Sequence, residues 1–133
     1  MKLIVCLSDD NGMMFNHRRQ SRDRVLTEDL LKSVGQSRLF VMPYSVSLFG
    51  ENLPNLIVSE DPLNDAGERD FCFLETHSPT SDKNVSELIV YHWNRHYPSD
   101  TPFLLDMTPF SLVSVTEFAG FSHEKITKEI WKK

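Results

Sequence analysis

The sequence predicts a single α/β domain with a mainly parallel sheet, an antiparallel edge and few helices. The chain has 133 residues, which suits one domain with a core large enough to need neither metals nor disulfides. Its early apolar runs are short and continuous, as is typical of parallel strands buried on both faces. Its late runs alternate between apolar and polar residues, as is typical of antiparallel strands with one solvated face.

The first half of the chain is predicted to hold a buried strand, a loop and a helix. The strand is KLIVCLS (2–8), a continuous apolar run that DDNG terminates. Residues 9–22 are polar and rich in turn formers, which indicates a long loop. Thr27 is placed to cap the helix, whose first turn carries Glu28 and Asp29. The helix has one apolar face, formed by Leu26, Leu30, Leu31 and Val34. Gly35 is placed to end it.

The second half is predicted to be mostly strands. Residues 44–49 suit either a short helix or an extended piece, and periodicity does not decide between them. Residues 76–86 form a polar connection. The C-terminal segment 123–133 alternates and suits a final strand or a short helix. The other predicted strands are 38–42, 55–59, 70–75, 87–93 and 110–118.

Composition limits the classes of function and location. The formal net charge is -5 and the sequence pI is about 5.5, which argue against a globally basic nucleic-acid binder but leave room for a local basic patch. The apolar run at the start is too short for a signal peptide, and no stretch approaches a membrane span. We therefore expect a cytoplasmic protein without membrane contact, with Cys6 and Cys72 as reduced core residues.

The run NHRRQSRDR (16–24) concentrates four arginines in this acidic chain. Guanidinium groups bind phosphate or carboxylate through two parallel hydrogen bonds. The run therefore predicts a site for an anionic small molecule or a nucleic-acid phosphate, made by Arg18, Arg19 and Arg22. The alternative is that the arginines pair with the chain's own acids, among them Asp9, Asp10 and Asp23.

A second polar group, YHWNRHYPSD (91–100), follows the predicted strand 87–93. If that strand runs parallel to the first one, its end opens at the same sheet edge as the arginine run, where ligand crevices form. His92 or His96 could then act as a general base beside the arginines. Further ligand-binding candidates are Asn94, Arg95 and Tyr97.

A plainer alternative for the same segment is a strand exit with aromatic packing and partly exposed histidines. The spacing of His92 and His96 suits zinc only on a helix, and Pro98 follows closely, so no metal site is predicted. The histidines of other segments, among them His123, are interpreted as surface residues.

Four segments together resemble dihydrofolate reductase over most of the chain. They are LIVCLSDDNGMMFN, EDLLKS, RLFVMPYSVSLFGENLPNLIVSED and SDTPFLLDMTPFSLVSVTEF. The resemblance implies a reduced version of that fold. It also implies that Asp29, followed by Leu30, corresponds to the proton-handling acid of the family. RRQSRD and WNRHYP further resemble a set of short bacterial proteins.

The departures from dihydrofolate reductase fall on the parts that bind cofactor and folate. The family's Gly-Arg and following Thr, which cradle cofactor phosphates, are replaced by the segment 42–46. The Gly-Gly turn is absent, Asn55 and Leu56 stand where the folate-binding arginine should follow Leu53-Pro54, and the arginine run replaces a tryptophan. We therefore expect no cofactor and no folate reduction.

Two other functions stay open at this point. One is a non-catalytic protein-interaction module, because arginines and aromatic residues such as Tyr91, Trp93 and Tyr97 are enriched at interface hot spots. The other is a diverged pterin- or nucleotide-dependent reductase that uses Asp29.

Overall fold

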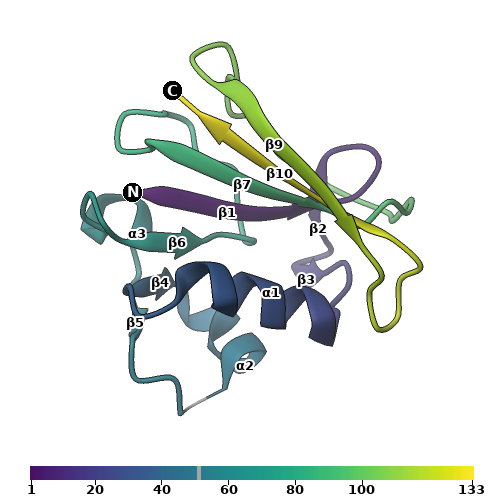
Figure 1. The fold of residues 1–133 in the computed structure, drawn as a ribbon, viewed down its shortest axis with the longest axis horizontal. Coiled ribbons are helices and arrows are strands. Elements are labelled where there is room, and N and C mark those ends of the chain that lie inside the picture. Colours follow the sequence, from purple (N-terminus) through teal and green to yellow (C-terminus); the bar gives the residue numbers. More distant parts are fainter. Residues whose placement is uncertain (51) are drawn as a thin grey trace.

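The computed structural model describes residues 1–50 and 52–133, which form one seven-stranded sheet with the order β5-β4-β6-β1-β7-β10-β9 (Figure 1). The first five strands of that order run parallel, and β10 and β9 run antiparallel at one edge. This confirms the predicted fold class. The strands are β1 (Lys2–Leu7), β4 (Leu39–Val41), β5 (Leu56–Val58), β6 (Phe71–Phe73), β7 (Glu87–His92), β9 (Ser111–Phe118) and β10 (Ile126–Lys132).

Strand β1 lies at the centre of the sheet because its side chains are apolar on both faces. Leu3 is paired with Cys72 of β6 on one side and with Leu88 of β7 on the other. The strand 87–93 therefore does run parallel to the first strand and directly beside it. The carboxyl ends of β1, β6 and β7 open on one edge, where ligand crevices form in such sheets.

The main helix is α1 (Arg24–Val34), which begins earlier than the sequence analysis placed it. The predicted Thr27 cap is wrong, because extended Asp23 accepts hydrogen bonds from Val25 N and Leu26 N, while the Thr27 hydroxyl donates to the Asp23 carbonyl. Gly35 ends the helix with φ 58°, as predicted.

Two segments that the sequence left open are now assigned. Residues 43–49 form a 3-10 turn, η1 (Pro43–Ser45), followed by α2 (Val46–Phe49). The C-terminal segment forms strand β10, because its backbone pairs with β7 and β9 along its length. The remaining helix is α3 (Pro62–Asp65).

The predicted loop 9–22 contains two short strands, β2 (Gly12–Phe15) and β3 (Arg18–Arg19). With β8 (Thr101–Pro102) they form a small second sheet of order β3-β2-β8. Strand β2 pairs with the two-residue strand β3 and with β8, which lies far along the chain. The loop prediction missed these strands because strands this short show no periodicity.

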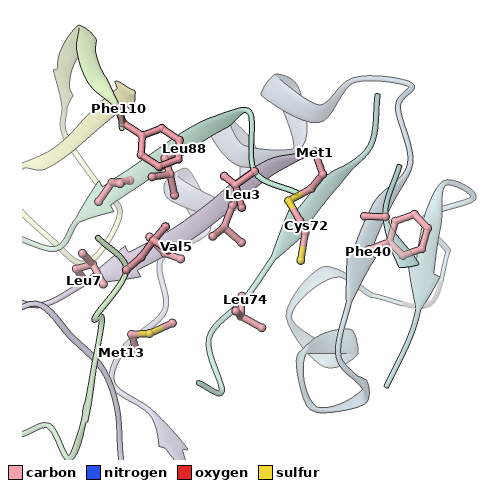
Figure 2. Close-up of a cluster of buried hydrophobic side chains, with 14 of the residues drawn as sticks. Met1, Leu3, Val5, Leu7, Met13, Phe40, Cys72, Leu74, Leu88 and Phe110 are labelled. Atoms are coloured by element: carbon pink, nitrogen blue, oxygen red, sulfur yellow. The ribbon is translucent and has the colours of Figure 1, made fainter. Parts of the chain in front are cut away.

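The buried side chains form one apolar layer on each face of the large sheet. Leu26, Leu30 and Val34 of α1 pack with Ile4 of β1 on one face, where Figure 1 shows α1 and α2 lying against the sheet. Connecting segments rather than long helices cover the other face. Figure 2 shows alternate β1 side chains in that layer, and its labelled members are Met1, Leu3, Val5, Leu7, Met13, Phe40, Cys72, Leu74, Leu88 and Phe110.

Cys6, which is half-buried, and Cys72, which is buried, are free thiols. Burial raises the pKa of both thiols, that of Cys72 to about 12, so they stay protonated and unreactive near neutral pH. Within residues 1–50 and 52–133, no helix has the length and apolar character to cross a bilayer.

Leu30→Ala should lower the free energy of unfolding by about 2–5 kcal/mol, because Leu30 is fully buried between α1 and the sheet. Urea denaturation measures the change. Leu104→Ala is the control: Leu104 is 74% exposed, so its loss should cost less than about 0.5 kcal/mol. Equal effects of the two variants would contradict the packing described here.

Candidate functional site

The arginine run lies over the carboxyl edge of the parallel strands, at the end of β1. Strands β2 and β3 form a hairpin in which Phe15 pairs with Arg18. Asn16 and His17 both have positive φ, 52° and 59°, as in the tight two-residue turns that match strand twist. The Asn16 N–H donates to an Asp100 carboxylate oxygen, which fixes this turn.

Arg19 is bound by an acid of the chain itself. Its guanidinium donates two hydrogen bonds to Glu75, at 2.7 and 2.8 Å, and this contact raises the pKa of Arg19 despite its partial burial. Glu75 follows strand β6, is 5% exposed and also accepts from the Ser45 hydroxyl. The Arg19 backbone N–H donates to the Tyr44 hydroxyl, and its guanidinium lies over the Tyr44 ring. The alternative interpretation therefore holds for Arg19, because an acid of the chain itself neutralises its charge.

Arg18 and Arg22 are exposed beside Arg19. Among the described residues, neither makes an ion pair with an acid. All three arginines line one open hollow of about 520 Å³. Its lining residues are His17, Arg18, Arg19, Ser21, Arg22 and Tyr44. The structure therefore brings together the arginines that the sequence singled out.

The histidines of the segment 92–97 do not point at this hollow. His92 Nε2 lies 2.8 Å from a Glu129 carboxylate oxygen, and exposed His96 Nδ1 lies 3.0 Å from one of Asp10. Each histidine therefore contacts the carboxylate of an acid that lies outside the arginine run. A general-base role at the hollow finds no geometric support for either residue.

The other candidates of this segment divide between two places. The Asn94 amide donates to the Lys125 carbonyl and to Thr127, and so holds the start of β10. Arg95 lines a separate hollow with Asn94 and Lys125. Tyr97 does reach the arginine run, because its hydroxyl lies 3.2 Å from the hydroxyl of Ser21.

Asp29 lies on α1, away from the arginine hollow. Its carboxylate accepts a 2.6 Å hydrogen bond from the Tyr91 hydroxyl and lies 2.9 Å from Lys128 Nζ. Burial and the adjacent Asp29 together raise the pKa of Tyr91 well above its usual range, so Tyr91 remains the donor. Both partners come from strands β7 and β10, so this contact ties the helix to the sheet.

The sequence analysis missed a buried polar cluster around Asp23, which is 3% exposed. Besides capping α1, its carboxylate accepts from the backbone N–H groups of Phe121 and Ser122, each at 2.9 Å. His123 Nδ1 lies 2.9 Å from the same carboxylate. Burial alone would raise the pKa of Asp23, but these hydrogen bonds outweigh it and hold the pKa far below its usual range. Asp23 therefore stays ionised.

His123 is buried rather than exposed, at 4%, so its interpretation as a surface residue was wrong. Its ring stacks on Trp93 with centroids 4.7 Å apart, and its Nε2 lies 3.1 Å from Ser21 Oγ and 2.9 Å from the Tyr97 hydroxyl. The turn between β9 and β10 brings it there. An Asp directly before the helix was the one local signal for this cluster, because Asp favours the N-cap.

No group of three metal-binding side chains was found in the part of the chain that the structure describes. The chemistry available at this edge is thus that of exposed guanidinium groups, a serine, a tyrosine and an Asp–His pair.

Asp23→Asn should lower the free energy of unfolding by about 2–4 kcal/mol at neutral pH, because the amide presents donors to Ser122 N and His123. The folded pKa of Asp23 is depressed, so its contribution is complete above the unfolded pKa of about 4 and is lost as pH falls below it. The deficit of the variant should therefore shrink in acid.

Denaturation at several pH values measures this deficit. Asp10→Asn is the matched control, because Asp10 makes only an exposed contact with His96. A deficit for Asp23→Asn that is the same at low and neutral pH would contradict the assignment of an ionised carboxylate.

Comparisons with known proteins bear on the fold. No protein-family model matches the chain, and no curated protein matches it significantly. Among solved structures, it is similar to a dihydrofolate reductase from Enterococcus faecalis, complexed with NADP(H) and RAB-propyl. The TM-score is 0.72 and the sequence identity 10%, over 98% of this chain and 94% of that one. The chain therefore has a dihydrofolate-reductase-like fold, which confirms that part of the resemblance.

Proposed function

We propose that this protein binds the phosphate groups of an anionic ligand, a nucleotide or an RNA, in the hollow lined by Arg18, Arg19 and Arg22. The observation that carries the proposal is that Arg18 and Arg22 are exposed on one hollow without an acidic partner among the described residues. In a chain of net charge -5, two such neighbouring cations form a local positive site.

The arrangement suits a phosphate more than a single point charge. Each guanidinium offers a planar pair of donors, and phosphate oxygens accept such pairs. Ser21 lines the same hollow. The hollow is open, so the ligand would keep part of its surface in water.

Glu75 limits the affinity of this site. It lies beside Arg19 and opposes the approach of an anion, while holding the arginine run against β6. Binding then depends chiefly on Arg18 and Arg22.

A role in folate reduction is not part of this proposal. The carboxylate that the resemblance implies as the proton-handling acid, Asp29, is engaged by Tyr91 and Lys128 on another part of the helix. The setting we propose is the cytoplasm of a bacterial cell, supported by the free thiols of Cys6 and Cys72 and by the resemblance to short bacterial proteins.

Strand β9 supports a second candidate function, a protein-interaction surface. It is an edge strand of eight residues and exposes Leu112, Val113 and Val115. Tyr91 and Trp93, which first suggested an interface, are buried and do not contribute.

Arg18→Gln combined with Arg22→Gln should weaken binding of pyrophosphate at least about tenfold, because each charge-assisted contact is worth about 1.5–3 kcal/mol. Titration calorimetry at low salt measures the dissociation constant, with a mononucleotide and a short RNA as further ligands. Arg69→Gln is the control, since it removes one positive charge from an exposed residue of the loop before β6. A dissociation constant unchanged in the double variant would refute the site.

Glu75→Gln should act in the opposite direction and tighten pyrophosphate binding several-fold, because it frees the charge of Arg19. The same variant should lower the melting temperature, because a buried ion pair loses one partner. If binding weakened instead, Arg19 would have to be positioned by Glu75 for the ligand.

Val113→Lys combined with Val115→Lys tests the second candidate. Both side chains are more than half exposed, so the monomer should remain folded. Sedimentation of the unaltered chain should show concentration-dependent association that the variant abolishes. If sedimentation showed that the unaltered chain stays monomeric at every concentration, self-association through β9 would be excluded.

A further inference from the structure

Ser21, His123 and Asp23 are joined by hydrogen bonds in the order found in serine hydrolases. Asp23 binds His123 Nδ1 at 2.9 Å, and His123 Nε2 lies 3.1 Å from Ser21 Oγ. We propose that Ser21 is a nucleophile, that His123 is its general base, and that the site hydrolyses a carboxylic ester carrying an anionic group. The esterase step goes beyond the proposed function. Only the preference for an anionic ester rests on the proposed anion site.

Asp23 fixes which nitrogen of His123 carries a proton. Every neighbour within hydrogen-bonding distance of its carboxylate is a donor: the N–H groups of Val25, Leu26, Phe121 and Ser122, and the Ser122 hydroxyl. An ionised carboxylate is itself only an acceptor, so the Nδ1 of His123 must donate to it. The neutral imidazole then presents an unprotonated Nε2, which is the form that a general base needs.

The Tyr97 hydroxyl contacts both members of this pair, at 3.2 Å from Ser21 Oγ and 2.9 Å from His123 Nε2. It carries one proton and can donate to only one of them. In the reactive arrangement Tyr97 donates to Ser21 Oγ, and the Ser21 hydroxyl donates to His123 Nε2. The same Tyr97 hydroxyl would stabilise negative charge on Ser21 Oγ as the proton leaves.

Trp93 completes the support of the base. Its ring stacks on His123 with an interplanar angle of 29°, which fixes the plane of the imidazole and shields one face from water. Trp93 follows β7 directly, so a rigid strand end positions it. A base held in this way needs little reorganisation before reaction.

Ser21 is also accessible to a substrate. It is half-buried and lines the hollow that holds Arg18, Arg19 and Arg22. A carboxylate or phosphate on the substrate, bound by Arg18 or Arg22, would place a nearby ester carbonyl at Ser21.

The reaction balances with water as the only co-reactant. Ser21 Oγ forms a bond to the ester carbonyl carbon while its proton passes to His123 Nε2. The carbon–oxygen bond to the alcohol breaks, and His123 returns the proton to that alcohol. Water, deprotonated by His123, then attacks the acyl-Ser21 carbonyl carbon. The bond from that carbon to Ser21 Oγ breaks, His123 returns the proton to Oγ, and the acid is released.

The first test is covalent labelling of the full chain with diisopropyl fluorophosphate, followed by peptide mass spectrometry. Ser21 should be the labelled residue, and Ser21→Ala should abolish the label. His123→Gln should slow labelling about 100-fold. Ser47→Ala, an equal change at an exposed position of α2, should be labelled like the unaltered chain. Thermal melts establish that each variant is folded.

Two outcomes would overturn the inference. One is the absence of any label on Ser21 in the unaltered, folded chain. The other is labelling of Ser21 at the same rate in folded His123→Gln, which would mean that His123 does not activate it. If His123→Gln fails to fold, Tyr97→Phe replaces it, with slower labelling expected from the loss of the Tyr97 hydroxyl.

Ester hydrolysis separates this inference from the proposed anion site. The neutral p-nitrophenyl acetate and the anionic mono-p-nitrophenyl succinate are compared. Arg18→Gln with Arg22→Gln should remove the preference for the anionic ester, measured as the ratio of kcat/KM for the two esters. Labelling without any anionic preference in the unaltered chain would support the nucleophile and refute the anion site.

Asp23 acts through His123 and is a positioning residue. Asp23→Asn should lower kcat for p-nitrophenyl acetate about 100-fold with little change in KM, under conditions where the variant remains folded. An Asp23 that served only as a helix cap would leave kcat of the folded fraction unchanged, and that result would remove it from the mechanism.

Discussion

The buried carboxylate of Asp23 is the constraint on which the rest of this edge of the molecule depends. It caps α1, holds the turn between β9 and β10 through Phe121 and Ser122, and sets the orientation of His123. Burying a lone carboxylate is costly, and here hydrogen bonds from backbone and side chains offset that cost. Two parts of the chain that share no strand pairing, the start of α1 and the turn between β9 and β10, therefore meet at one charged group within the arginine run.

The four arginines of the run have different physical roles, although the sequence presents them as equivalent. Arg19 is neutralised by Glu75 and attaches the run to the end of β6, and Arg24 packs its guanidinium over Phe121. Arg18 and Arg22 stay exposed on the hollow. Two arginines thus hold the run in place, and the other two are those of the proposed anion site. The alternative interpretation, pairing with an acid of the chain itself, applies to Arg19.

Much of the sheet could be predicted because burial of a parallel strand leaves a local signal, a short continuous apolar run such as that of β1 or β7. The arginines were found for a similar reason, since their clustering is visible in one stretch of sequence. The strands within 9–22 and the burial of His123 could not be found in this way. They depend on β8, Trp93 and Asp23, which lie far from them along the chain. The Thr27 cap failed locally, because Asp23, four residues earlier, competes for the same helix start.

A TM-score of 0.72 at 10% identity shows that the same fold forms from a very different set of side chains. In this chain the carboxyl edge of the apolar sheet acts as a rigid platform that positions Glu75 after β6 and Trp93 after β7. Ser21, Arg18 and Arg22 belong instead to a segment that side-chain contacts attach to this platform. Chemistry on this edge can therefore change by replacing the attached segment and its contacts while the sheet stays the same, since the strands contribute supporting groups and the segment contributes the groups that would meet a ligand.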